Sequence, residues 1–190
     1  MSLKISLFLV FLFISACQPV EFVKAVKTDN SNLAEISISA NEILINVKYN
    51  QLFSEQNIED QTIVTPLELI SSWNKNNIKK VGNENKLIIN IIDASIIKSE
   101  IDNIEAKNYE EKTIFKYEVF FLVEYELYDN SNFLIANTTV QSSRSTTSQK
   151  YISLNEFEII TSQLLDEAIK DFVQESKLML NNYMGKYLLN

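Results

Sequence analysis

Cysteine and histidine, which serve widely as nucleophiles, bases and metal ligands, are almost absent from this chain. The 190 residues contain no histidine and a single cysteine, Cys17. These counts exclude a Ser-His-Asp or Cys-His catalytic system, a histidine-ligated zinc site and an intramolecular disulfide. We therefore expect a protein that is not an enzyme, with no catalytic residue, no metal site and no cofactor. The thiol of Cys17 is the one remaining group with distinctive chemistry.

Carboxylates offer the only alternative chemistry. Asp93 interrupts an isoleucine-rich run, and five acids lie in the stretch 99–112. A cluster of this kind could bind calcium, but the ordered spacing and the glycine of a known calcium loop are missing. We expect Asp93 to mark the exposed end of a strand or a hydrogen-bonded turn, and 99–112 to be a solvated acidic loop. A hydrolase that uses these acids remains the least favoured hypothesis.

The residues before Cys17 form an export signal. Met1 to Lys4 is weakly basic, and the apolar run 5–14 is shorter than the roughly 20 residues that span a bilayer. Ordinary secretion would leave Cys17 as an incidental thiol. The run Ile14-Ser15-Ala16-Cys17, however, resembles the lipobox of bacterial lipoproteins, with an aliphatic residue, two small residues and then cysteine. That resemblance implies cleavage before Cys17, a diacylglyceryl thioether on its sulfur, and an acyl chain such as palmitate on the new amino group.

The leader also sets the expected domain boundaries and location. We predict a signal peptide at 1–16, a lipidated cysteine and tether at 17–33, and a single domain at 34–190. Within the tether, 21–26 could instead be a short strand or a docking segment. Gln18 is not the aspartate that the sorting rule associates with the inner membrane. We therefore expect an outer-membrane anchor facing the periplasm, with the outer leaflet of the inner membrane less favoured.

The net charge of the chain limits the classes of binding partner that we expect. The chain carries a formal charge of −8. This acidity argues against nucleic acid and against binding through anionic phospholipid or lipopolysaccharide phosphates. The membrane is therefore expected as a partner through the lipid on Cys17, with an unidentified envelope protein as a second partner.

Patterning in the first half of the domain predicts strands followed by a helix. Residues 34–49 alternate between apolar and polar, with a one-residue slip at 41–42 that suggests a bulge or a break between two strands. Thr65 to Glu68 forms a capping box, so we predict a helix over 66–81 ended by Gly82. Trp73 on this helix is expected to be a core anchor; the alternative is a surface on which a ligand stacks.

The second half predicts three further strands. Residues 86–97 are rich in isoleucine, 113–128 alternate throughout, and 133–140 return after a turn at 129–132. The polar run 141–148 either continues the last strand as an edge or is flexible. Arg144, the only arginine, is expected to pair with a neighbouring acid, although its fork could also grip a carboxylate or phosphate ligand.

A long helix completes the predicted chain. Ser153 to Glu156 is a second capping box, and an apolar stripe follows as far as Leu188. Such a helix would be about 50 Å long, which exceeds the width of a four-stranded sheet. We expect 179–189 to overhang, or the helix to break near 181–182. The overhanging side chains are a candidate partner surface, unless they pack on the N-terminal segment: Tyr183, Tyr187, Leu188 and Leu189.

Together these elements predict an α+β fold. The expected architecture is a two-layer sandwich, with a mostly antiparallel sheet of about four strands and one short and one long C-terminal helix on one face. This plan, with the lipobox, resembles small envelope lipoproteins of Gram-negative proteobacteria. Pro66, Trp73, Asp93-Ala94 and Arg144 resemble loose markers of an uncharacterised group of these proteins.

Two described groups share the general plan: the lipoprotein that plugs the lipopolysaccharide-export barrel, and the auxiliary lipoproteins of lipid-transport ABC systems. The resemblance implies a non-enzymatic accessory in envelope assembly or transport that acts through protein–protein contacts. The alternative is a periplasmic module that binds lipid or a small apolar ligand between helix and sheet.

Overall fold

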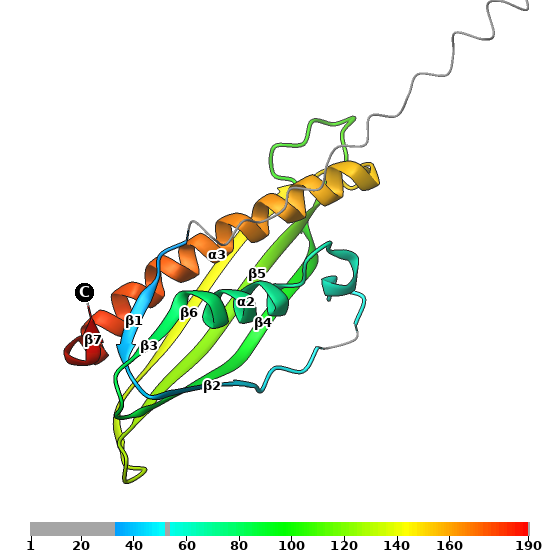
Figure 1. Cartoon of the computed structure of the whole chain (residues 1–190). Helices are drawn as coiled ribbons and strands as arrows, with labels where there is room; N and C mark the ends of the chain where they lie inside the picture. The colour runs from blue at the N-terminus through cyan, green and yellow to red at the C-terminus, as the bar shows by residue number, and fades with distance from the viewer. Residues whose placement is uncertain (1–32, 52–53, 190) are drawn as a thin grey trace, which may run out of the picture.

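The structure, a computed structural model, describes residues 33–51 and 54–189 (Figure 1). The predicted leader, Cys17 and all of the predicted tether except Leu33 lie outside these residues. The described elements, in chain order, are β1 (Ile36–Ser39), β2 (Glu42–Val47), η2 (Glu59–Gln61), α2 (Pro66–Asn77), β3 (Ile78–Val81), β4 (Lys86–Asp102), β5 (Thr113–Tyr128), β6 (Leu134–Ser148), α3 (Leu154–Met184), η3 (Gly185–Tyr187) and β7 (Leu188–Leu189).

The main sheet confirms the predicted α+β class. Its four strands lie in the order β2-β4-β5-β6, with β4, β5 and β6 antiparallel and β2 parallel to β4. Figure 1 shows α2 and α3 on the same face of this sheet. Within the described residues, no helix is both long and apolar enough to cross a membrane.

Strand β5 forms the centre of the core, as its alternation predicts. Six alternate side chains face the helices and are almost completely buried: Tyr117, Val119, Phe121, Val123, Tyr125 and Leu127. Between them stand partly exposed residues on the opposite face. Fully burying one such apolar side chain stabilises the fold by about 1.5–3 kcal/mol, so this strand anchors the domain.

Helix α2 begins where predicted but ends four residues early. Thr65 Oγ1 accepts from the backbone N–H of Glu68, and Glu68 Oε2 accepts from the backbone N–H of Thr65. The predicted end at Val81 is wrong, because Ile78 turns into extended backbone and Ile78–Val81 pairs with β1 as a parallel strand. Gly82, with φ of +115°, therefore ends a strand and does not cap a helix.

The slip at residues 41–42 is a break between two strands in different sheets. β1 lies at the centre of a small sheet of order β3-β1-β7, whereas β2 is an edge of the main sheet. Ala40 is fully buried at the crossing point. The predicted single stretch of alternation therefore contributes to both sheets, and β3 and β7 are strands that the pattern did not predict.

Helix α3 lies along the sheet, so the predicted overhang does not form. Its capping box at Ser153 and Glu156 is confirmed. At 1.5 Å per residue its 31 residues span roughly 46 Å, and the 16 residues of β5 span a similar length of roughly 53 Å. An overhang would require α3 to cross the strands, where the sheet is narrow. Instead α3 runs along the direction of β6, where the sheet is long (Figure 1). After Met184 the chain turns through η3 into β7.

Candidate functional site

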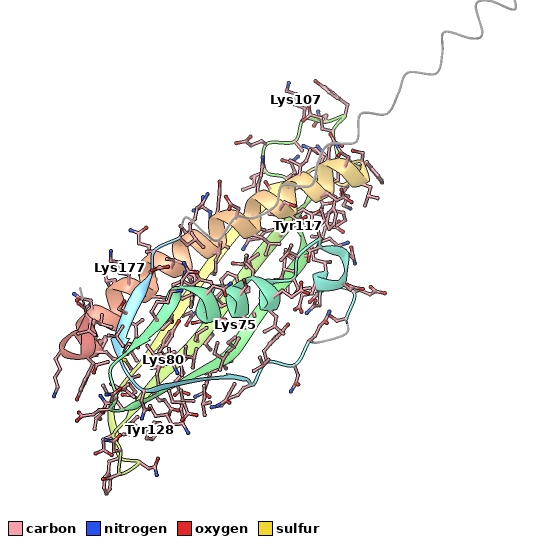
Figure 2. The ribbon with its side chains drawn as sticks, in the orientation of Figure 1. Lys75, Lys80, Lys107, Tyr117, Tyr128 and Lys177 are labelled. Atoms are coloured by element: carbon pink, nitrogen blue, oxygen red, sulfur yellow. The ribbon has the colours of Figure 1, made fainter. Side chains whose placement is uncertain are left out.

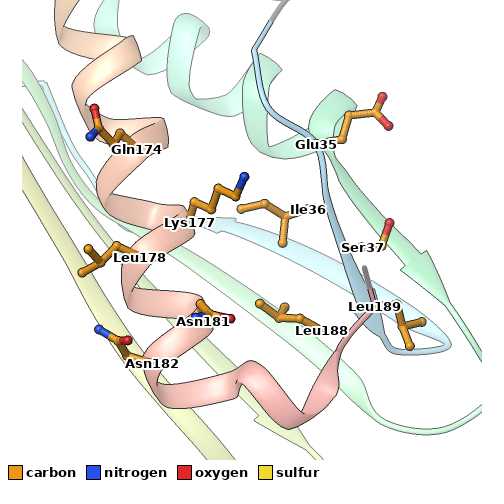
Figure 3. Close-up of a pocket in the computed structure, with 10 residues that line it drawn as sticks. All are labelled: Glu35, Ile36, Ser37, Gln174, Lys177, Leu178, Asn181, Asn182, Leu188 and Leu189. Atoms are coloured by element: carbon orange, nitrogen blue, oxygen red, sulfur yellow. The ribbon is translucent and has the colours of Figure 1, made fainter.

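An open groove lies beside the C-terminal half of α3, where β1 and β7 pass it (Figure 3). Its volume is about 680 Å³, within the range of small-ligand sites. The lining residues come from β1 with the residue before it, from α3 and from β7: Glu35, Ile36, Ser37, Gln174, Lys177, Leu178, Asn181, Asn182, Leu188 and Leu189.

The β7 strand builds one wall of this groove. Leu188 pairs with Ile38 and Leu189 with Ser37 in antiparallel register. This pairing holds two leucines against the flank of α3, and Leu189 remains 46% exposed. Leu178 on α3 is 52% exposed. The groove therefore presents apolar side chains to solvent from α3 and from β7, the strand that follows α3 in the chain.

Four residues were predicted as a partner surface, and the structure brings only two of them into the groove. Leu188 and Leu189 line it. Tyr183 is exposed on α3 outside the lining, and the ring of half-buried Tyr187 lies 4.8 Å below the ammonium of Lys186. The role of all four as a partner surface stays a prediction.

Polar side chains give the groove a mixed character. Glu35 and Lys177 carry opposite charges, and Gln174, Asn181 and Asn182 add amides along α3. In Figure 3, Lys177 reaches from α3 toward Ile36. Amide side chains donate and accept hydrogen bonds, as a peptide backbone requires. The arrangement suits an extended apolar peptide more than a hydrocarbon chain, because a hydrocarbon chain cannot form hydrogen bonds with these side chains.

The sequence pattern missed the α3 wall of the groove. Leu178 stands one position before Met179 on the predicted apolar stripe, and Gln174 and Asn181 read as a solvated helix face. Only the return of β7 onto β1 converts that face into a wall. Local periodicity contains no signal for this long-range pairing.

Asp93 is not at a strand end or a turn, so that prediction is wrong. It lies in the middle of β4, at a register shift between Ile91 and Asp93 that marks a β-bulge. The bulge re-aims the carboxylate, as bulges do. Its Oδ1 is buried and has no hydrogen-bond partner among the described residues. The charge of Asp93 acts on Tyr49 nearby.

Half-buried Tyr49 and buried Asn57 and Glu59 form a polar cluster that the sequence did not reveal. The hydroxyl of Tyr49 and the Nδ2 of Asn57 both donate to Glu59 Oε1, and Glu59 is 2% exposed. Burial, followed by the bond to Glu59 and its charge, raises the pKa of Tyr49 far above its usual value. The hydroxyl is therefore a hydrogen-bond donor at neutral pH and cannot act there as a base.

The predicted acidic loop at 99–112 is only partly a loop. β4 continues to Asp102, and the connection to β5 occupies 103–112. Glu100 pairs with Lys150, which lowers the pKa of the carboxyl through a hydrogen bond to that lysine. No group of three or more metal-ligating side chains gathers within 33–51 and 54–189.

Arg144 pairs with acids, as predicted. The run 141–148 continues β6 as an edge strand, and the Arg144 guanidinium bonds Glu167 at 2.6 Å and Asp171 at 2.9 Å. Both acids lie one turn apart on α3. The fork of the guanidinium is thereby used to fasten the helix to the sheet edge.

No protein-family model and no curated protein matches this sequence. Among solved structures, the chain is similar to a minor lipoprotein from Acinetobacter baumannii, at 12% identity over 77% of this chain and 96% of that one, with a TM-score of 0.39. It is also similar to the rare lipoprotein B from Shewanella oneidensis, at 13% identity over 73% and 94%, with a TM-score of 0.36. Likenesses at this level carry no argument about function.

Proposed function

We propose that this protein is a lipid-anchored lipoprotein of the Gram-negative outer membrane, faces the periplasm, and is a non-enzymatic accessory in envelope assembly or transport. It acts by holding an extended apolar segment of an envelope protein in the groove between α3, β1 and β7. The observation that carries the proposal is this groove, with the exposed leucines Leu178 of α3 and Leu189 of β7 among its lining residues.

The position of the groove supports a role near the membrane. The chain enters the domain at Leu33, whose carbonyl accepts from the Asn77 side chain at 2.9 Å. Glu35 and Ile36, which follow at once, already line the groove. A tether anchored through Cys17 therefore delivers its partner site close to the point of attachment.

Packing of the interior favours protein contacts over an internal lipid. The space between the helices and the sheet is filled by Trp73, Phe121 and Phe172, each at most 1% exposed. The Phe121 and Phe172 rings meet at a centroid distance of 5.5 Å. A hydrocarbon chain held between helix and sheet would have to displace these rings. The lipid-binding alternative is therefore the weaker one.

Site-specific photo-cross-linking in cells tests the proposal. A photoreactive amino acid replaces Leu178 or Leu189 in the groove, and Leu154 serves as the matched control. Leu154 is a leucine on the same helix, 72% exposed and outside the groove lining. We expect one membrane protein to be captured from positions 178 and 189 and not from 154, and its yield to fall in a Cys17→Ala background. Equal capture at all three positions, or none in the groove, would overturn the proposal.

A charge substitution gives an independent readout. Leu178→Asp places a carboxylate on the groove wall, and Leu154→Asp makes the same change outside it. Because both leucines are exposed, both variants should fold with nearly unchanged free energies of unfolding. Only Leu178→Asp should lose the captured partner at position 189.

A further inference from the structure

A second groove, between β2, α2 and β3, differs from the first in its charge. Its volume is about 330 Å³. Three lysines and three isoleucines line it with one asparagine, and no acid does: Ile43, Ile45, Asn74, Lys75, Ile78, Lys79 and Lys80. The first groove contains a charge of each sign, so this lining is distinct. A local concentration of lysines is unexpected on a chain of net charge −8.

Two of the three ammonium groups have no ion pair within the described part of the chain. Lys79 lies 3.8 Å from Glu35, with both side chains largely exposed, which makes that bridge weak. Lys80 Nζ donates to the backbone carbonyl of Asn41 at 3.1 Å and meets no carboxylate. Lys75 lies in the last turn of α2. Their positive charge is therefore available to an anion.

The floor of the groove is apolar. Ile43 and Ile45 of β2 face it from the sheet edge, and Ile78 begins β3 on the other side. A cationic rim around an aliphatic floor matches a ligand with an anionic head and an apolar stem. The volume lies at the lower end of the range for small-ligand sites, so it suits a head group with its first methylenes.

The groove also lies where the chain enters the domain. Asn77, between Lys75 and Lys79, holds the carbonyl of Leu33, and Lys79 faces Glu35. The 16 peptide units between Cys17 and Leu33 can span up to roughly 55 Å, so an anchored domain can bring this groove to the bilayer surface. Delivery of the groove to the bilayer by the tether rests on the anchor in the proposed function. The existence of the groove does not depend on that anchor.

We propose that the groove of Lys75, Lys79 and Lys80 binds the phosphate head group of an anionic phospholipid while the acyl chains remain in the membrane. The overall acidity of the chain predicts no such attraction, and the groove is a local exception to it. Each lysine near an anionic membrane strengthens binding by a similar factor. Removal of two lysines should therefore weaken the affinity by about thirtyfold.

Vesicle flotation tests this binding without the anchor. Residues 18–190 are used, because this chain lacks the predicted leader and Cys17 but keeps the whole described domain with its buried core. The vesicles are phosphatidylcholine alone, or an equimolar mixture of phosphatidylcholine and phosphatidylglycerol. We expect flotation with the mixture only, and about thirtyfold weaker binding for Lys75→Gln/Lys80→Gln.

The matched control is Lys107→Gln/Lys170→Gln, which removes the same charge elsewhere. Lys107 lies in the connection between β4 and β5, and Figure 2 shows it at the upper end of the molecule, away from Lys75 and Lys80. This control should bind like the unaltered chain, and thermal melts establish that both double variants fold. Equal loss in both pairs, or equal binding to both vesicle types, would overturn the proposal.

Inorganic phosphate separates a lipid from a free anion. If phosphate below physiological ionic strength displaces the vesicles completely and binds the groove by itself, the site is for the free anion and the lipid proposal is wrong. If displacement needs general high salt, the lipid head group is supported. If Cys17 is not acylated, the anchor in the proposed function is wrong. The vesicle binding of residues 18–190 does not depend on that anchor and would still hold.

Discussion

Trp73 on α2 and Phe172 on α3 meet edge to face, with ring centroids 5.8 Å apart and planes at 87°. Phe172 also touches Phe121 of β5 in a similar arrangement. The edge-to-face geometry is favourable for aromatic pairs. Phe172 is thus the place where both helices and the central strand join, and both rings are fully buried.

Replacement of Phe172 should therefore be costly. We expect Phe172→Ala to lower the free energy of unfolding by about 3–5 kcal/mol, because it leaves a cavity at a junction of three elements. Urea denaturation followed by the fluorescence of Trp73, the only tryptophan, measures the loss. Leu178→Ala, at an exposed site on the same helix, should change stability by about 0.5 kcal/mol or less. Similar losses in both variants would contradict this account of the core.

Alkaline pH should unfold the domain through the half-buried Tyr49 and the fully buried Tyr125. Burial raises the pKa of Tyr49 and Tyr125 far above the usual value near 10. A raised folded-state pKa means that the contribution to stability is complete below pH 10 and is lost as pH rises above it, because the unfolded chain releases protons that the folded chain retains.

Ultraviolet absorbance of tyrosinate against pH checks this expectation. Of the 8 tyrosines, at least two should ionise only together with unfolding, as monitored by circular dichroism. Tyr49→Phe and Tyr125→Phe should each remove one tyrosine from that late step. Complete ionisation in a chain that is still folded would show that neither hydroxyl is protected.

Arg144 should contribute less to the stability of the fold than its two ion pairs suggest. The side chains of Arg144, Glu167 and Asp171 are all 42–54% exposed, and exposed ion pairs contribute up to about 1 kcal/mol each. We expect Arg144→Ala to lower the free energy of unfolding only slightly at low salt and less at high salt, measured by urea denaturation. Arg144→Lys should recover only part, because an ammonium cannot reach both acids with the same fork. A loss that salt does not alter would indicate packing and not charge.

Cys17 should carry the membrane anchor. We expect Cys17→Ala to abolish incorporation of labelled palmitate and to leave the uncleaved precursor, detected by its larger mass. Ala16→Ser keeps a small residue before the cysteine and should remain lipidated. Palmitate on the alanine variant would contradict the lipobox reading.

Elements set by local chemistry could be predicted from the sequence, and those set by distant pairing could not. Both ends of β5 and both capping boxes agree with the structure because each depends on neighbours in the chain. Ile78 and Val81 suit a helix stripe and a strand equally well. The segment becomes a strand because β1 pairs with Ile78–Val81. No pattern within the segment indicates that pairing.

The candidate site divides in the same way. Leu188 and Leu189 stand out as apolar residues near the end of the chain, whereas Leu178 and Gln174 gain significance only after β7 has returned to β1. The sequence shows Asp93 as an interruption of an apolar run, whereas the bulge at Asp93 depends on the alignment of β4 with β5. The crossing angle of α3 over the sheet, which removed the expected overhang, is likewise a property of packing.

The small sheet joins Ile38 to Leu188, nearly the whole length of the domain apart. A chain that is exported with its N-terminus first delivers β1 early, and that strand then waits without β7 until almost all of the domain has crossed. Pairing over such a separation is slow, because the loop must close before the contact forms. Under the proposed function, export would therefore leave an interval in which one edge of β1 has no partner strand.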